Sequence, residues 1–288
     1  MNYRHAFHAG NFADVFKHTV LCRILHYLCE KPAAFRVIDT HAGAGLYDLT
    51  SSEARRGGEW PGGIGRLMAA VEAGEIPEKA VALLTPYLDV IGAFNERGKL
   101  RTYPGSPAVA RAFLRPQDKL IACEMEPAAA RDLARHLDND GRIKSIEIDG
   151  WTALGAYVPP PERRGLVLVD PPFEEEADFH RLSHLLGIAH RKWSTGVYAL
   201  WYPIKGRGEA DALAKRVRKL GIGKVLRAEH LVSPVSNQSR LNGSGFILVN
   251  PPWTLEAELK VLLPVLAQLL ARETNSGGYT IEWLAGEG

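Results

Sequence analysis

The chain has 288 residues, of which 46% are hydrophobic, enough for one large domain or for a domain with an insertion. Its formal net charge of +2 is lower than usual for a protein that coats nucleic acid along a broad face, but it does not exclude an RNA substrate. No apolar run reaches the roughly 18 residues of a membrane span, and the polar start lacks a signal-peptide core. We therefore expect a cytoplasmic protein without a membrane segment, whose three cysteines stay reduced.

Short apolar runs indicate seven β-strands, and runs of this length are typical of a parallel sheet covered on both faces. The expected strands are 35–39, 120–123, 143–148, 166–169, 197–201, 225–232 and 246–249. Helical periodicity occurs at 14–29, 80–95, 128–137 and 179–188. A run at 280–284 leaves room for a later strand. The alternation predicts an α/β fold with a doubly wound, mostly parallel sheet that binds ligands at the carboxyl ends of its strands.

Residues 48–105 interrupt this alternation. The segment has no convincing strand; it is rich in glycine near 57–65 and then helical. We expect it to form a small inserted helical subdomain. Residues 1–47 and 106–288 then form the main domain, with an N-terminal arm and helix.

A loop of small residues follows the first strand, Asp39-Thr40-His41-Ala42-Gly43-Ala44-Gly45. Gly43 and Gly45 let the backbone turn tightly and approach a nucleotide-like cofactor, although the third glycine of the dinucleotide pattern is missing. An acidic residue at the end of the next strand binds a ribose in such sites. The candidate is Glu124, which lies 79 positions after Gly45 because of the insertion. These two features alone fit a nucleotide site and an ordinary strand end equally well.

A second loop, Asp170-Pro171-Pro172-Phe173, follows the strand at 166–169. The two prolines fix the backbone and remove two amide donors, which leaves carbonyls free to accept hydrogen bonds. Asp170 and the Pro171 carbonyl can accept the hydrogens of an exocyclic amine, and Phe173 can stack on the ring that carries it. Such an amine is a poor nucleophile, so the pattern indicates methyl transfer from S-adenosylmethionine (SAM), with Asp170 as the proton acceptor.

A similar tetrapeptide, Asn250-Pro251-Pro252-Trp253, follows the run at 246–249. If 225–232 and 246–249 form an antiparallel hairpin that closes the sheet, this loop lies at the sheet end away from the cofactor. We therefore interpret it as a structural turn.

Four histidines near the start, His5, His8, His18 and His41, suggest a metal site at first sight. No cysteine or carboxylate accompanies them at a recognisable ligand spacing, so we expect no metal. The helix at 14–29 can instead place Lys17 and His18 on a cofactor, and His41 faces either a ligand or the core.

Several segments together resemble the RlmJ family, whose members are adenine-N6 methyltransferases that act on large-subunit (23S) ribosomal RNA. They are residues 3–11, 14–18, 39–45, 103–107, 170–173 and 199–203. The likeness covers nearly the whole chain. It implies a Rossmann-like methyltransferase domain with a small helical insertion, SAM as the cofactor and ribosomal RNA as the partner. We expect a monomer.

The resemblance also implies site residues, with Asp170, Pro171, Pro172 and Phe173 as the catalytic segment and Tyr3 in contact with RNA. Glu124 would bind the ribose hydroxyls, and Asp149 the adenine amine of SAM. The family commonly has tyrosine where this chain has Phe173, which keeps the stacking face and loses a hydroxyl. The expected SAM-binding residues are Lys17, His18, His41, Gly43, Gly45, Ser106, Glu124, Asp149, Gly150 and Asp170.

Three other functions are alternatives to this one. The amine can belong to DNA adenine or to a protein glutamine, because the loop chemistry is the same. The chain can also be a non-catalytic RNA-binding module on a methyltransferase-like fold. A nicotinamide oxidoreductase is the weakest alternative, because hydride transfer gives the segment at 170–173 no role.

Overall fold

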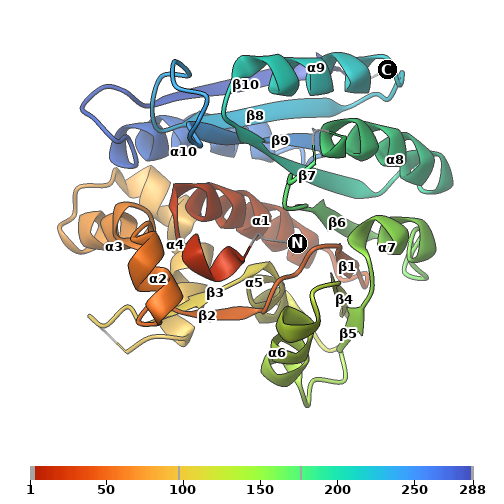
Figure 1. The fold of residues 1–288 in the computed structure, drawn as a ribbon. Coiled ribbons are helices and arrows are strands. Elements are labelled where there is room, and N and C mark those ends of the chain that lie inside the picture. The colour runs from red at the N-terminus through yellow and green to blue at the C-terminus, as the bar shows by residue number, and fades with distance from the viewer. Residues whose placement is uncertain (1–3, 97, 176, 287–288) are drawn as a thin grey trace.

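The computed structural model in Figure 1 describes residues 4–96, 98–175 and 177–286. In this part of the chain an eight-stranded sheet has the order β10-β8-β9-β7-β6-β1-β4-β5. Its strands are β1 (Arg36–Asp39), β4 (Lys119–Glu124), β5 (Ile143–Glu147), β6 (Gly165–Val169), β7 (Val197–Ile204), β8 (Val225–Leu231), β9 (Gly243–Val249) and β10 (Gly278–Ala285). All seven expected strands are therefore present, within a few residues of the expected limits.

The sheet is mixed but mostly parallel. Parallel pairing joins β5, β4, β1, β6 and β7. Strand β9 lies antiparallel between β7 and β8, so β8 runs in the same direction as β7. The expectation of a seven-stranded sheet was wrong, because β10 adds an eighth strand, antiparallel to β8, at the edge. β10 is mostly half-exposed, so it lacks the continuous buried run by which the other strands were identified.

Helices cover both faces of the sheet (Figure 1). The helices on one face are α1 (Phe12–Glu30), α5 (Ser106–Phe113), α6 (Pro127–Leu137) and α10 (Leu255–Leu269). Those on the other face are α7 (Gly150–Ala156), α8 (Asp178–Lys192) and α9 (Arg207–Arg218). The helices expected at 14–29, 128–137 and 179–188 correspond to α1, α6 and α8. Each face has its own apolar core, as a doubly wound sheet requires.

The segment between β1 and α5 is mostly helical. It contains α2 (Ser52–Gly57), α3 (Ile64–Glu72) and α4 (Glu78–Ala93), and the turn η2 (Trp60–Gly62) precedes α3. Two three-residue strands, β2 (Leu46–Asp48) and β3 (Thr102–Pro104), pair antiparallel at its base and bring its ends together. They are too short to give an apolar pattern, so no strand was expected here. The α4 helix packs against α1 and α10 (Figure 1).

The topology places the glycine loop and the loop after β6 at the same end of the sheet. The carboxyl ends of β4, β1, β6 and β7 lie side by side, because these four strands are parallel neighbours. Residues of the turn η1 (His5–Phe7) and of the start of α1 also line the cavity at these strand ends. Among the described residues, no helix is both long and apolar enough to cross a membrane, and no cluster of side chains has the composition of a metal site.

Candidate functional site

A cavity of about 980 Å³ opens at the carboxyl ends of the central strands. Most of the site residues expected from the sequence line it, although their positions span the chain from α1 to the loop after β6. Those that line it are Lys17, His18, His41, Gly43, Ser106, Glu124, Asp170, Pro171, Pro172 and Phe173. Gly45, Asp149 and Gly150 are not among the lining residues, and Tyr3 lies outside the described residues.

The glycine loop after β1 is held against the end of β4. Gly43 and Gly45 have positive φ angles of 62° and 83°, a backbone conformation that favours glycine. The Gly43 amide donates to Oε2 of Glu124 at 2.8 Å, and the Glu126 amide donates to Oε1 at the same distance. Glu124 is therefore fixed at the mouth of the loop, and its carboxylate faces the cavity.

Asp149 and Gly150 lie next to this loop. Asp149 caps α7, since its Oδ2 accepts from the amide and the hydroxyl of Thr152. Gly150 packs so closely on the loop that a Cβ there would lie 2.2 Å from the Thr40 carbonyl oxygen and 2.6 Å from the His41 ring. Gly150 thus packs against His41, which does line the cavity, whereas Asp149 fixes the start of α7.

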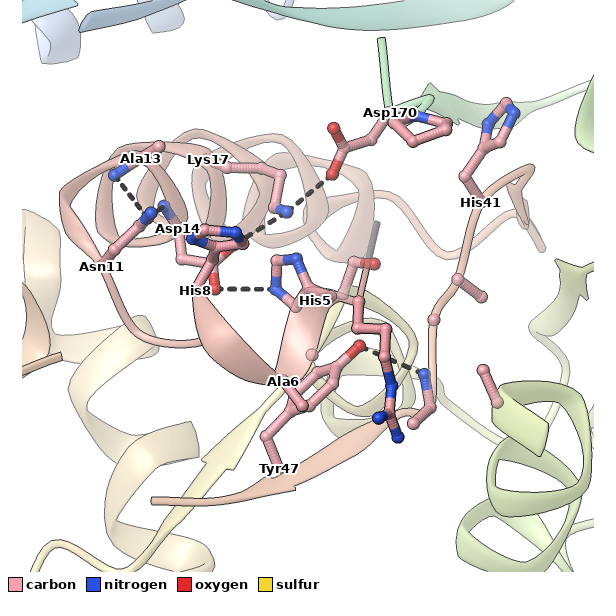
Figure 2. A pocket seen from close by; sticks show the side chains of 18 of the residues that line it. His5, Ala6, His8, Asn11, Ala13, Asp14, Lys17, His41, Tyr47 and Asp170 are labelled. Carbon is pink, nitrogen blue, oxygen red and sulfur yellow. Dashed lines mark hydrogen bonds and ion pairs between the residues drawn. The ribbon is translucent and has the colours of Figure 1, made fainter. Parts of the chain in front are cut away.

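Lys17 joins two carboxylates from distant parts of the chain (Figure 2). Its Nζ lies 2.9 Å from Oδ1 of Asp14 and 2.6 Å from Oδ2 of Asp170. Burial disfavours the charge of Lys17, but the two carboxylates outweigh it and raise the pKa of Lys17 well above its usual value. Lys17 therefore stays protonated and holds Asp170 in one orientation.

The start of α1 fixes Asp14. Asn11 caps the helix by accepting from the amides of Ala13 and Asp14, and the Gly10 amide donates to Oδ2 of Asp14 at 2.9 Å. The His5 ring lies 3.0 Å from the same oxygen. Burial opposes the charge of Asp14, yet His5 and Lys17 together lower its pKa well below the usual range.

His18 and His41 are neutral at physiological pH, because burial lowers the pKa of His18 to about 3 and that of His41 to about 4. Nδ1 of His18 lies 2.8 Å from the Tyr103 hydroxyl, and the Tyr87 hydroxyl lies 2.9 Å beyond it. His18 thus points toward β3 and α4, whereas Lys17 reaches across to the loop after β6. Both side chains line the cavity, with different partners.

The Asp170-Pro171-Pro172-Phe173 loop begins where the buried strand β6 ends. Phe173 has a φ angle of +50°, a left-handed conformation that is uncommon for a side chain of this size and is often found at functional sites. The turn places its ring 4.7 Å from the ring of Phe179 and 6.0 Å from that of Trp201. Asp170 and an aromatic wall thus face the same cavity.

The similar tetrapeptide after β9 lies at the opposite end of the sheet, as expected. Val249, which precedes it, pairs with Tyr198 near the start of β7. The Asn250 side-chain amide donates to the carbonyls of Ser194 and Gly196, which precede that strand. This loop therefore serves as a structural turn.

Sequence reasoning missed several residues that the structure places at the site. Asp14 was not expected at the site. It reaches Asp170 through Lys17, which lies 153 positions before Asp170 in the chain. Asp39 ends β1 beneath the glycine loop without lining the cavity, and burial raises its pKa to about 7. Trp201 was noted only within the family-like segment at 199–203, and it lines the cavity beside Phe173.

Known proteins resemble this chain over its whole length. A family model described as "Ribosomal RNA large subunit methyltransferase D, RlmJ" matches residues 32–285. Proteins named ribosomal RNA large subunit methyltransferase J share 40% identity (Escherichia coli K12) and 38% identity (Haemophilus influenzae), each over 100% of both chains. The crystal structure of a Legionella pneumophila protein superimposes with a TM-score of 0.87 at 33% identity, covering 96% of this chain and 98% of that one.

Proposed function

The chain belongs to the RlmJ family of large-subunit ribosomal RNA methyltransferases, and from this premise we propose that it methylates the exocyclic N6 amine of an adenine in that RNA, using SAM. The observation that carries the proposal is the position of Asp170. It follows β6 at the edge where the glycine loop and Glu124 also lie, and Lys17 holds it in place at 2.6 Å. The amine acceptor and the nucleotide-type loop therefore share one cavity.

The residues at the β4 side of the cavity fit SAM, which carries two cationic groups and a ribose with two hydroxyls. Glu124 supplies an acceptor for the ribose hydroxyls beside the glycine loop. We assign to cofactor binding Lys17, His18, His41, Gly43, Gly45, Ser106, Glu124, Asp149, Gly150 and Asp170.

SAM, when bound, supplies an electrophilic methyl group. The exocyclic nitrogen of adenine is a weak nucleophile, because its lone pair is delocalised into the ring. Asp170 and the Pro171 carbonyl accept the two amine hydrogens and draw the nitrogen toward tetrahedral geometry. Lys17 contacts Oδ2 of Asp170, so Oδ1 is available to accept a hydrogen and then the proton that the product loses.

Phe173 and Trp201 form the aromatic wall on which the adenine stacks, a contact worth about 1–3 kcal/mol per base. Most of the rate then comes from alignment of the nitrogen with the methyl carbon. Because an adenine inside a stacked helix cannot reach this cavity, the target base has to leave its stack, as is usual for enzymes that modify bases.

An Asp170→Asn variant tests the proposal. The change keeps the shape of the side chain and removes its charge. Since Asp170 is only one of the ten residues assigned to the cofactor, we expect SAM binding by calorimetry to weaken only slightly, while methyl transfer to unmodified large-subunit ribosomal RNA falls at least 100-fold (about 2.7 kcal/mol). Phe173→Ala should remove stacking worth about 1–3 kcal/mol and slow methyl transfer accordingly. Trp253→Ala, in the similar loop after β9, is the control. Trp253 is 81% exposed, and its removal should have no effect. Full activity of Asp170→Asn would refute the assignment.

A further inference from the structure

The two sides of the cavity carry opposite charges. The strand order places Glu124 after β4, the glycine loop after β1, Asp170 after β6 and Lys205 after β7. Carboxylates gather on the β4 side, where Glu126 and Asp132 also line the cavity. The opposite side is cationic, and its charges remain unexplained by the cofactor site.

Three cations on this opposite side form what we call the basic wall: Lys205, Arg240 and Arg272. Lys205 follows β7, Arg240 lies in the loop between β8 and β9, and Arg272 follows α10. All three are exposed and line the same cavity as Asp170. Segments far apart in the sequence thus converge to place three positive charges beside the proposed target site.

Buried hydrogen bonds hold the basic wall in place. Asn242 is fully buried and donates to the carbonyls of Lys205 and Asn237, which ties the loop that carries Arg240 to the end of β7. The Arg272 guanidinium donates to the Leu241 carbonyl at 2.9 Å, next to Arg240. The three cations are therefore positioned by the backbone before any ligand arrives.

No carboxylate neutralises these cations directly. Within residues 4–96, 98–175 and 177–286, none of the three forms an ion pair with an acid. The charge of Glu59 acts on Arg272 from a distance, while its two carboxylate oxygens contact His8 and Asn11. Burial and the charge of Arg240 lower the pKa of Arg272, which shows that the two guanidinium groups repel each other. Exposed cations that line one cavity and form no ion pair with an acid are suited to an anion.

We propose that the basic wall binds the phosphates of the RNA strand next to the adenine that enters the cavity. This inference rests on the proposed function for the location of the adenine between Phe173 and Asp170. Phosphate contacts of this kind fix the register of a nucleic acid without reading its sequence. They would hold the backbone on the β7 side while the cofactor occupies the β4 side.

The test is a Lys205→Gln/Arg240→Gln double variant, bound to unmodified large-subunit ribosomal RNA transcribed in vitro, over a series of KCl concentrations. Each lost phosphate contact should reduce the slope of log K against log salt by about 0.7–0.9. We expect the double variant to lose about 1.4–1.8 in slope and to bind RNA about tenfold more weakly at low salt, with a raised KM for RNA. SAM binding by calorimetry should match the wild type. Arg272 is left intact because it also supports the loop.

Lys219→Gln is the control, because Lys219 is an exposed cation that follows α9 and does not line the cavity. It should keep the affinity and the salt slope of the wild type. Wild-type binding by the double variant would overturn the proposal, as would an equal loss in Lys219→Gln, since the effect would then come from net charge alone. A wild-type enzyme that binds RNA through the basic wall but transfers no methyl group would refute the proposed function and support the wall.

Discussion

Lys17 is the residue on which the geometry of the site depends most. It lies between Asp14 and Asp170, with a side chain only 7% exposed. Its raised pKa and the lowered pKa of Asp14 mean that both groups are charged throughout the neutral range. The stabilisation from Asp14 is present above pH about 4 and is lost as pH falls through its folded pKa, whereas that from Lys17 is lost only as pH rises above about 10.

A Lys17→Met variant should therefore lose stability as well as activity. Removal of one partner of a buried ion pair leaves uncompensated charge and costs about 3–5 kcal/mol. We expect a loss of that size in the free energy of urea unfolding, and loss of methyl transfer in the folded fraction because Asp170 is released. Lys219→Met, at an exposed position, serves as the control. A loss below about 1 kcal/mol for Lys17→Met would mean that the ion pairs contribute little.

At this scale the sequence predicts residue types better than partners. Asp170 and Phe173 were expected because acceptor, proline and aromatic residues in that order serve an amine. Lys17 was expected on the cofactor from its helix and from the family resemblance, and no pattern in the sequence links it to Asp14 and Asp170. Such pairings depend on how β6 and α1 pack, which local sequence does not encode. The basic wall was not predicted, for the same reason.

The glycine loop between β1 and β2 is the element that shapes the cofactor side of the cavity. Gly43 has a φ angle of +62°, and a Cβ there would lie 2.2 Å from the Tyr47 hydroxyl. That hydroxyl accepts from the Ala44 amide and so belongs to the loop. Gly74, after α3, has a φ angle of +68° but open space around it.

Alanine substitutions at Gly43 and Gly74 distinguish the cost of backbone strain from the cost of a steric clash. Gly74→Ala should cost about 1–2 kcal/mol of unfolding free energy, because alanine is strained in the left-handed region. Gly43→Ala adds a clash worth roughly 1–3 kcal/mol, and it should also abolish SAM binding. Urea unfolding and calorimetry measure the two effects. Equal stability losses and normal SAM binding in Gly43→Ala would show that the loop can rearrange around a methyl group.

The elements were predictable where burial is complete. The runs at 166–169 and 246–249 became β6 and β9, because strands covered on both faces read as continuous apolar sequence. β10 is an edge strand with one half-exposed face, so its pattern was ambiguous. The short ribbon of β2 and β3 is set by the return of the chain from the segment at 48–105, which we propose to be an inserted subdomain.

At the scale of the whole molecule, buried neutral histidines make the free energy of unfolding fall as the pH is lowered. Burial lowers the pKa of His230, like that of His41, to about 4, and that of His18 to about 3. Each takes up a proton on unfolding as pH falls below about 6.5. Asp39, with its pKa raised to about 7, releases a proton on unfolding instead. The raised pKa of His8 also opposes proton uptake, but weakly. Near pH 5.5 the unfolding reaction therefore takes up about two protons.

Stability should fall by about 2–3 kcal/mol per pH unit between pH 6 and pH 5. Chemical unfolding at a series of pH values measures this slope. His230 packs between Phe12 and Phe16, so His230→Leu should fold and reduce the slope by about 1.4 kcal/mol per pH unit, or one proton. A flat profile in the wild type would contradict the burial of these rings as neutral groups.

The central claim is the identity of the methylated atom, and nucleoside mass spectrometry tests it most directly. The purified protein would be incubated with methyl-labelled SAM and unmodified large-subunit ribosomal RNA, with DNA and a glutamine-containing protein in parallel reactions. We predict label in N6-methyladenosine from the RNA alone, and none with Asp170→Asn. Label in another nucleoside, in DNA or in protein, or no label in the RNA, would contradict the proposal.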